Sequence, residues 1–231
     1  PKNSIITPVC NTDEICLRRA VESVLNQVYN NWELCIAEGG STKSNLKNLL
    51  KEYSHKDDRI KIKYLDKNEG IAGNSNQALS LANGEFVAFL DHDDEIAPFA
   101  LYEVVKIINQ NSEIDFIYSD EDKLDEAGNR CDVFFKPDWS PDLILSCMYT
   151  CHLGVYRKQV VDKIGGFRLG FEGSQDYDFL LRFIENIDQR NIVHIPKVLY
   201  HWRKIPGSIA RDPNAKYLIN IQAAKKALND A

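Results

Sequence analysis

Several features that would point at once to a class of protein are missing from this sequence. No apolar run approaches the ~18 residues of a membrane-spanning helix, so we expect no membrane span. Basic residues number 28 against 34 acidic ones, and the net charge of −6 lacks the basic excess of proteins that bind nucleic acid. Nucleic acid is therefore not an expected partner, and an anionic ligand would need a few placed cations or a metal ion.

The glycine-rich motifs of nucleotide-binding enzymes are also missing. The absence of Gly-x-Gly-x-x-Gly argues against a dinucleotide oxidoreductase, and the absence of Gly-Lys-Ser/Thr argues against a P-loop enzyme. Neither Gly-x-Ser-x-Gly nor His-Glu-x-x-His occurs. A phosphorylated ligand would therefore be met by clustered carboxylates and a divalent cation, because Mg²⁺ and Mn²⁺ prefer oxygen ligands and bridge phosphates.

Cysteine usage gives little sign of a disulfide or metal framework. There are six cysteines but no Cys-x-x-Cys pair. Cys147, Cys151 and His152 suggest a zinc site, but further ligands at metal spacing are missing. We therefore expect free thiols and a cytoplasmic location. The chain begins at Pro1 without a signal peptide, and we expect it to be a processed chain or a piece of something longer.

Apolar strands alternate with amphipathic helices through the first half of the chain. Asn11 and Glu14 predict a capping box at the start of the first helix. Strands are expected at 4–9, 32–37, 59–65 and 85–90, with helices between them at about 14–28, 46–53 and 76–82. This order is typical of an open, mainly parallel sheet, which binds ligands at the carboxyl ends of its strands. The loops after Val9, Ala37 and Leu90 should therefore meet at one crevice.

The second half of the chain is less regular. Helices are expected from about residue 98, at about 177–187 and at 216–228, and strands at 115–119, 152–156 and 192–203. The acidic stretch 120–126 is expected at the surface, although Asp120 could face a ligand. A proline-spaced segment at 136–142 is interpreted either as a stiffened loop or as a ligand contact through Trp139.

A concentrated acidic turn follows the fourth predicted strand. The apolar run FVAFL at 86–90 leads directly into Asp91, Asp93, Asp94 and Glu95. Such close like charges repel one another unless water or a cation offsets the repulsion. The acids can cap the helix expected near Pro98, since carboxylates favour helix N-termini, or they can bind a metal ion. Both interpretations can hold for different members of the turn.

Six short segments occur in an order that we associate with one enzyme family. They are TPVCN at 7–11, WELCIAE at 32–38, NEGIAG at 68–73, LDHDD at 90–94, GSQDYD at 173–178 and HWRKIPGS at 201–208. In these segments the chain resembles the family-2 glycosyltransferases of the GT-A fold, of the type that assembles bacterial surface polysaccharides. The resemblance implies an α/β protein with a mostly parallel central sheet flanked by helices.

The resemblance also implies an activity and a domain layout. The expected reaction moves a sugar, with inversion, from a UDP-sugar or else a dTDP-sugar to a hydroxyl of a growing glycan, glycoprotein or lipid-linked acceptor. The acceptor or a further domain would bring the chain to the inner face of a membrane. One domain at 1–231 is expected, with a nucleotide-sugar-binding half at about 1–95, an acceptor-binding half at about 96–211 and a C-terminal helix at 212–231.

Roles for single residues are implied by the same resemblance. Asp91-His92-Asp93 matches the Asp-x-Asp motif, in which Asp91 faces the ribose and Asp93 ligates Mn²⁺ or Mg²⁺. Asp176 stands where the family has its general base, although Gln175 replaces the usual preceding glutamate. Further donor contacts are implied at Thr7, Pro8, Glu38, Gly73, Asn74, His92, Arg203 and Ser208, further metal ligands at Asp91 and His201, and acceptor contacts at Trp139 and Gln175.

Other interpretations remain open from the sequence. Asp176 can be a helix N-cap, His201 a core histidine and Arg203 a surface cation. A nucleotidyltransferase also pairs an α/β sheet with metal-binding carboxylates, but it usually carries a glycine-rich basic loop that is absent here. A non-catalytic glycan- or nucleotide-binding domain on a degenerate GT-A fold would have no need for a base such as Asp176.

Overall fold

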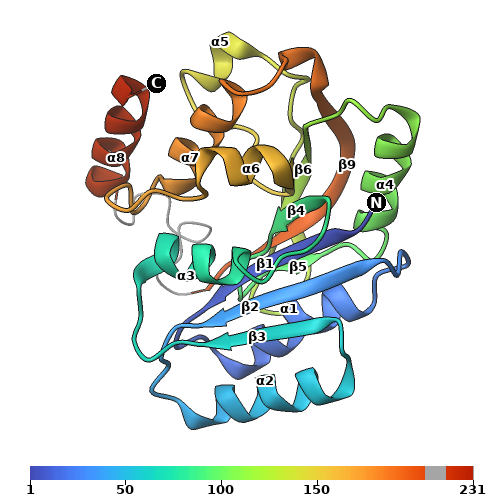
Figure 1. Ribbon diagram of the computed structural model, residues 1–231, viewed down its shortest axis with the longest axis vertical. Coiled ribbons are helices and arrows are strands. Elements are labelled where there is room, and N and C mark those ends of the chain that lie inside the picture. The colour runs from blue at the N-terminus through green and yellow to red at the C-terminus, as the bar shows by residue number, and fades with distance from the viewer. Residues whose placement is uncertain (206–216, 231) are drawn as a thin grey trace.

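The computed structural model describes residues 1–205 and 217–230. One nine-stranded sheet runs through the molecule in the order β3-β2-β1-β4-β8-β6-β9-β5, and β7 pairs with β6 outside this path. Helices cover both faces of the sheet (Figure 1). No helix in these described ranges is long and apolar enough to cross a membrane.

The first half of the chain forms the predicted parallel part of this sheet. Strand β1 lies between β2 and β4, and β3 pairs with the outer edge of β2, all in parallel. Apolar side chains alternate between the two faces, so that Ile5 joins one core and Ile6 the other. The bounds are β1 Asn3–Val9, α1 Glu14–Leu25, β2 Trp32–Glu38, α2 Ser44–Lys56, β3 Ile60–Tyr64, α3 Gly70–Leu79 and β4 Phe86–Phe89.

The cap of α1 differs from the predicted capping box. Asp13 is the N-cap, and its side chain accepts hydrogen bonds from the backbone N–H groups of Ile15 and Cys16. The side chain of Asn11 instead accepts from the backbone N–H of Thr42 at 2.9 Å. Asn11 therefore joins the loop after β1 to the loop after β2, at the end of the sheet where a ligand is expected.

The second half adds antiparallel strands to the sheet. Strand β8 runs antiparallel between β4 and β6, whereas β6 and β9 are parallel and β5 pairs antiparallel with β9. Helix α8 packs against α7. The bounds are β5 Glu95–Ile96, α4 Ala100–Gln110, β6 Phe116–Leu124, β7 Arg130–Phe134, α5 Pro141–Ile144, β8 Gly154–Arg157, α6 Lys158–Ile164, α7 Gln175–Ile184, β9 Ile192–Arg203 and α8 Tyr217–Asp230, with a 3-10 turn at Gln189–Asn191.

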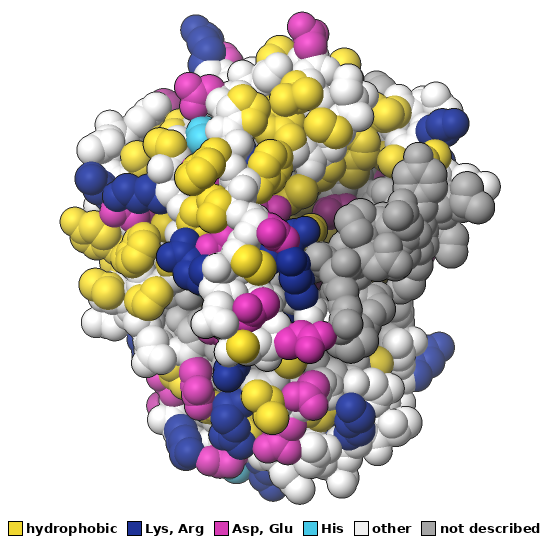
Figure 2. Space-filling view, turned by 180° about the vertical axis from the view of Figure 1, so that it is seen from behind, with side chains coloured by type: hydrophobic (Ala, Val, Ile, Leu, Met, Phe, Trp, Pro, Cys, Tyr) yellow, Lys and Arg dark blue, Asp and Glu magenta, His cyan; other side chains and the backbone are white. Residues whose placement is uncertain are grey.

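Two apolar cores lie on the two faces of the sheet. One includes the buried faces of α1, α2 and α4, and the other includes those of α3, α6 and α7. On the surface seen from behind, hydrophobic side chains gather in the upper half, and charges of both signs are interspersed in the lower half (Figure 2). The charged part of this face is therefore of mixed sign.

The expected surface position of the acidic stretch 120–126 is wrong for its first three residues. Strand β6 continues to Leu124, and Asp120, Glu121 and Asp122 have at most 6% of their surface exposed. Each is paired inside the protein: Asp120 with His194, Glu121 with Lys136, and Asp122 with Arg130 and His201. Burial of these acids is tolerated because every one has a cationic or imidazole partner.

Candidate active site

A cavity of about 410 Å³ opens where β1 and β4 end, as the topology predicts. Its wall also includes residues before β8, the start of α7 and the end of β9. Among the predicted site residues, the cavity is lined by Pro8, Asp91, Asp93, Gln175, Asp176 and Arg203. Ser208 lies outside the described residues.

Asp91, Asp93 and Asp94 of the acidic turn line the cavity, but they differ in how far the rest of the protein engages their carboxylates. The carboxylate of Asp94 is buried and accepts hydrogen bonds from the hydroxyl of Tyr200 at 2.7 Å and the backbone N–H of Arg203 at 2.8 Å. Burial, followed by the charges of Asp93 and Asp91, raises the pKa of Asp94 well above its usual range. Asp94 also lines the cavity, but both of its oxygens accept hydrogen bonds from β9, so Asp91 and Asp93 are the members left to meet a ligand.

Asp91 and Asp93 fit a binding site for a divalent cation in which a bound ligand supplies the remaining oxygen atoms. Withdrawal from bulk water, and then the charge of Asp93, raises the pKa of Asp91 to about 6. A cation beside these two carboxylates would relieve that repulsion. No group of three His, Cys, Asp or Glu side chains among the described residues is arranged to hold a metal by itself. Mg²⁺ and Mn²⁺ suit such a site, since Mg²⁺ is usually bound through one or two carboxylates together with phosphate oxygens.

His201 is separated from the other predicted metal ligands. Its Nδ1 contacts Asp122, and its side chain lines a second cavity together with Glu95 and Arg130. The neighbouring Trp202 lines the main cavity. These contacts place His201 at the second cavity, apart from Asp91 and Asp93.

Arg203 is held in place by the acidic turn itself. Its Nε donates a hydrogen bond to the backbone carbonyl of Asp93 at 3.0 Å, and its guanidinium also contacts the carboxylate of Glu95. Its exposed fraction is only 8%. In this structure Arg203 supports the turn, and its contact with a donor stays a prediction.

The predicted general base lies in the first turn of α7. Asp176 lines the cavity and accepts a hydrogen bond from the backbone N–H of Tyr177. Burial raises the pKa of Asp176. Gln175 faces the same cavity, and its side-chain oxygen accepts from the N–H of Gly173 at 2.9 Å. Asp178, two residues further on, is instead buried between Arg168 and Arg182.

Three of the predicted donor contacts, His92, Glu38 and Thr7, do not line the cavity in this structure. His92 places its Nδ1 3.0 Å from the carbonyl of Pro8. Glu38 is fully buried, with one oxygen accepting from the N–H of Ser41 and the other lying 3.7 Å from the Nζ of Lys47. The hydroxyl of Thr7 is buried without a hydrogen-bond partner among the described residues.

Gly73 and Asn74 act in packing around the start of α3. A Cβ on Gly73 would lie 2.6 Å from the Cβ of Glu69. The side chain of Asn74 donates to Asn68 and accepts from the N–H of Glu69, and it packs against Gly39. These residues thus join the loop after β2 to the loop before α3.

Trp139 does not line the cavity in this structure. Its ring packs against Phe116 and Tyr149, and its indole N–H donates to the side chain of Gln189 at 3.1 Å. Its contact with an acceptor stays a prediction.

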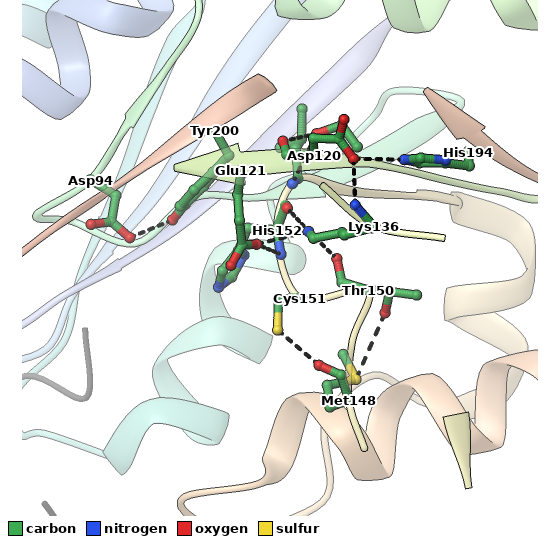
Figure 3. Close-up of polar contacts among 12 residues, drawn as sticks. Asp94, Asp120, Glu121, Lys136, Met148, Thr150, Cys151, His152, His194 and Tyr200 are labelled. Atoms are coloured by element: carbon green, nitrogen blue, oxygen red, sulfur yellow. Dashed lines mark hydrogen bonds and ion pairs between the residues drawn. The ribbon is translucent and has the colours of Figure 1, made fainter. Parts of the chain in front are cut away.

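His152 is a cavity residue that the sequence interpretation considered only as a metal ligand. Its ring stacks on Tyr200 with centroids 4.5 Å apart, and its Nε2 lies 3.9 Å from an Asp91 oxygen. Burial, and then the charge of Lys136, lowers the pKa of His152 to about 3. Figure 3 shows His152 beside Glu121 and Lys136. The sequence carries no local signal for this position, because its contacts come from β6, β9 and the segment after β7.

Comparison with known proteins identifies relatives over the whole chain. The model of the family described as glycosyl transferase family 2 matches residues 4–165. The chain is 44% identical over its full length to an uncharacterized protein, y4gI, of Sinorhizobium fredii. It is 38% identical over 91% of its length to the O-antigen biosynthesis protein RfbC of Myxococcus xanthus. It spans only 25% and 16% of the lengths of these two relatives.

Solved structures show the same fold at lower sequence identity. The S. aureus TarS fragment 1-349, in complex with UDP-GlcNAc, matches with a TM-score of 0.77 and 22% identity over 99% of this chain and 67% of that one. The mannosyltransferase PcManGT from Pyrobaculum calidifontis, in complex with GDP-Man and Mn²⁺, matches with a TM-score of 0.75 and 15% identity over 100% of this chain and 65% of that one. The predicted GT-A fold is therefore confirmed.

Proposed function

This chain belongs to glycosyl transferase family 2, and from that premise we propose that it moves a sugar from a nucleoside diphosphate donor, by an inverting and metal-dependent reaction, to a hydroxyl of a growing glycan. One observation carries the proposal: Asp91, Asp93 and Asp176 line a single cavity at the carboxyl end of the parallel strands. Two carboxylates suit a metal–diphosphate pair, and the third suits a base.

A uridine nucleotide is the favoured donor carrier, with a dTDP-sugar as the alternative. The structural likeness to a protein bound to UDP-GlcNAc supports this choice. The likeness to an O-antigen biosynthesis protein supports a polysaccharide acceptor, free or linked to protein or lipid. A lipid-linked acceptor would place the domain at a membrane surface.

Asp176 has the central chemical role in the proposed reaction. An acceptor hydroxyl is a weak nucleophile, and its proton must leave as the oxygen attacks the anomeric carbon. The carboxylate of Asp176 takes that proton while the bond to the diphosphate breaks on the opposite face of the sugar. Asp91 and Asp93 would hold Mn²⁺ or Mg²⁺, which supplies charge stabilisation for the departing nucleoside diphosphate. A single displacement of this kind inverts the anomeric configuration.

A donor panel tests the proposal. Purified protein is incubated with UDP-, dTDP- and GDP-sugars and glycan acceptors, with Mn²⁺ or with excess chelator. We expect glycoside product of inverted configuration and free nucleoside diphosphate, only with the metal. Formation of UTP and sugar 1-phosphate from a UDP-sugar and added pyrophosphate would indicate a nucleotidyltransferase. Donor or glycan binding without any product would indicate a non-catalytic binding domain.

A further inference from the structure

His152 forms part of the cavity wall directly beside the predicted metal-binding carboxylates. It precedes β8, and the sheet order β2-β1-β4-β8 places it on the far side of β4 from Glu38. If the nucleoside lies near β1 and β2 and the metal lies at the end of β4, the transferred sugar lies toward β8 and α7. His152 and Asp176 both line that part of the cavity.

The backbone around His152 is fixed by a buried ion pair. The Nζ of Lys136 is fully buried, lies 2.8 Å from a Glu121 oxygen and donates to the carbonyl of Thr150 at 2.7 Å and to that of His152. The same Glu121 oxygen accepts from the backbone N–H of His152 at 3.1 Å. Figure 3 shows this arrangement. Burial of an ion pair costs free energy, because both charges lose their hydration, and this pair fixes the backbone of a single turn.

The turn that carries His152 also has an unusual backbone. Cys151 adopts a φ of 34°, a left-handed conformation that is uncommon outside glycine. Such backbone conformations persist where the surrounding structure holds them in place, and they concentrate at functional sites. The contacts of Glu121 and Lys136 with the next residue, His152, hold the backbone here.

The ring of His152 is oriented by stacking, and its polar atoms are left for a ligand. It stacks on Tyr200 at an interplanar angle of 15° and contacts Trp202 at 5.5 Å between centroids. The 3.9 Å separation between its Nε2 and Asp91 exceeds a hydrogen bond. Within the described ranges, neither ring nitrogen has a hydrogen-bond partner. An imidazole can offer one donor and one acceptor nitrogen.

We propose that His152 forms a hydrogen bond with one ring hydroxyl of the transferred sugar and thereby contributes to the choice of donor. This inference rests on the proposed glycosyl transfer. Glu121 and Lys136 act through His152 as positioning residues. The ligand chemistry is a sugar hydroxyl, in contrast to the phosphate oxygens that the metal site would meet.

The test compares His152→Phe with the wild type on a donor series. Phenylalanine keeps a ring that can stack on Tyr200 but removes both nitrogens. The series contains the accepted UDP-sugar and analogues in which one ring hydroxyl at a time is removed. We expect His152→Phe to lower kcat/KM for the full donor by about tenfold. For one analogue the penalty that the wild type shows should disappear in the variant, because residue and hydroxyl form one interaction.

Two further variants separate this role from a structural one. His194→Phe is the matched control, since the His194 side chain is only 5% exposed and stacks on a tyrosine, Tyr118, at 4.9 Å between ring centroids, outside the cavity. It should change stability without changing the pattern of analogue penalties. His152→Gln retains a donor and an acceptor and should keep part of the selectivity.

Each other outcome overturns the inference. Unchanged penalties for every analogue in both His152 variants would show that no sugar hydroxyl meets this residue. Weaker binding of UDP with Mn²⁺ alone, measured by calorimetry on folded variant, would place His152 at the diphosphate. A wild type that transfers no sugar from any donor would overturn the proposed function itself, and this inference with it.

Discussion

The hydroxyl of Tyr200 lies 2.7 Å from a carboxylate oxygen of Asp94, to which it donates, and it accepts a hydrogen bond from the backbone N–H of Asp91 at 3.2 Å. One group on β9 thus joins both ends of the acidic turn. Asp91, Asp93 and Asp94 of this turn all line the cavity, so the shape of this wall depends on a strand more than 100 residues away in the sequence.

We expect Tyr200→Phe to destabilise the protein and to weaken the site. The buried Asp94 would retain the N–H of Arg203 but lose its hydroxyl donor, at a cost of about 1–3 kcal/mol. Urea unfolding measures this loss of stability, and titration with UDP and Mn²⁺ measures the affinity of the site. Tyr29→Phe is the control, because its hydroxyl makes a single bond to the carbonyl of Pro1. Equal effects of the two substitutions on nucleotide binding would contradict the assigned role.

Asp93 and Asp94 should respond differently to substitution by Asn. Asp93→Asn should remove most of the synergy between UDP and Mn²⁺ in thermal unfolding while leaving the apo protein folded, because Asp93 lines the cavity. A ligand at 100 times its Kd stabilises by about 2.7 kcal/mol, so the loss is easily measured. Asp94→Asn should instead lower the apo melting temperature. Stabilisation by UDP that is equally large in excess chelator would exclude the metal role.

The buried pair of Glu121 and Lys136 should be sensitive to removal of one partner. Lys136→Met leaves the Glu121 carboxylate buried without its cation and should cost about 3–5 kcal/mol in urea unfolding. Lys204→Met removes the cation of a pair with Asp132 at the surface, where solvent screens the charges, and should cost far less. Comparable losses in the two variants would mean that the buried pair contributes no more than a surface one.

The first half of the fold was predictable because its signals are local. Apolar runs in β1 and β2 are buried on both faces, and the amphipathic faces of α1 and α2 follow the helical period. Strand order then placed the acidic turn at the ligand-binding end of the sheet. The chain's membership of its family, and the location of Asp91, Asp93 and Asp176 in one cavity, agree with that reasoning.

The buried acids and the direction of His201 were not predictable from local pattern. Asp120 and Asp122 read as surface charges because their partners are distant, His194 and His201 lying 74 and 79 residues further along the chain. The pairing of β6 with β9 shifts register on both sides of Asp120. Such irregularity breaks the period of two, so the sequence could not tell which residues of β9 face the cavity.

The pH dependence of stability should carry a contribution from Glu33. Burial opposes its ionisation, but Lys2, Lys61, Ser4 and a backbone N–H outweigh burial and lower the pKa of Glu33 to about 2. The unfolded value is about 4.3, so the folded state holds fewer protons at acid pH. This stabilisation is complete above pH ~4.3 and is lost as pH falls toward ~2, at up to about 1.4 kcal/mol per pH unit.

Unfolding of Glu33→Gln between pH 3 and 6 measures this contribution. The variant should be less stable than the wild type at pH 6, and the difference should shrink as the pH falls. Glu52→Gln is the control, because Glu52 is exposed and its ion pair with Lys56 lies at the surface. A difference between Glu33→Gln and the wild type that stays constant over this range would show that the ionised carboxylate is not the stabilising form.

The two aspartates of α7 offer the sharpest separation of catalysis from stability. Asp176 faces the cavity, whereas Asp178 is 1% exposed and is held by Arg168 and Arg182. Asp176→Asn should keep the fold and the binding of UDP with Mn²⁺ but lower kcat by about 10²–10⁴-fold, since the amide cannot accept the acceptor's proton.

Asp178→Asn should do the reverse: it leaves two guanidinium groups without their buried carboxylate, so we expect a loss of about 3–5 kcal/mol in unfolding free energy. At a temperature where both proteins are folded, its kcat should stay close to that of the wild type. Single-turnover transfer, urea unfolding and the anomeric configuration of the product together check the assignment. Near-normal turnover by Asp176→Asn would assign the base to another residue, because inversion needs one proton acceptor on the face where the acceptor attacks, and a product of retained configuration would overturn the single displacement itself.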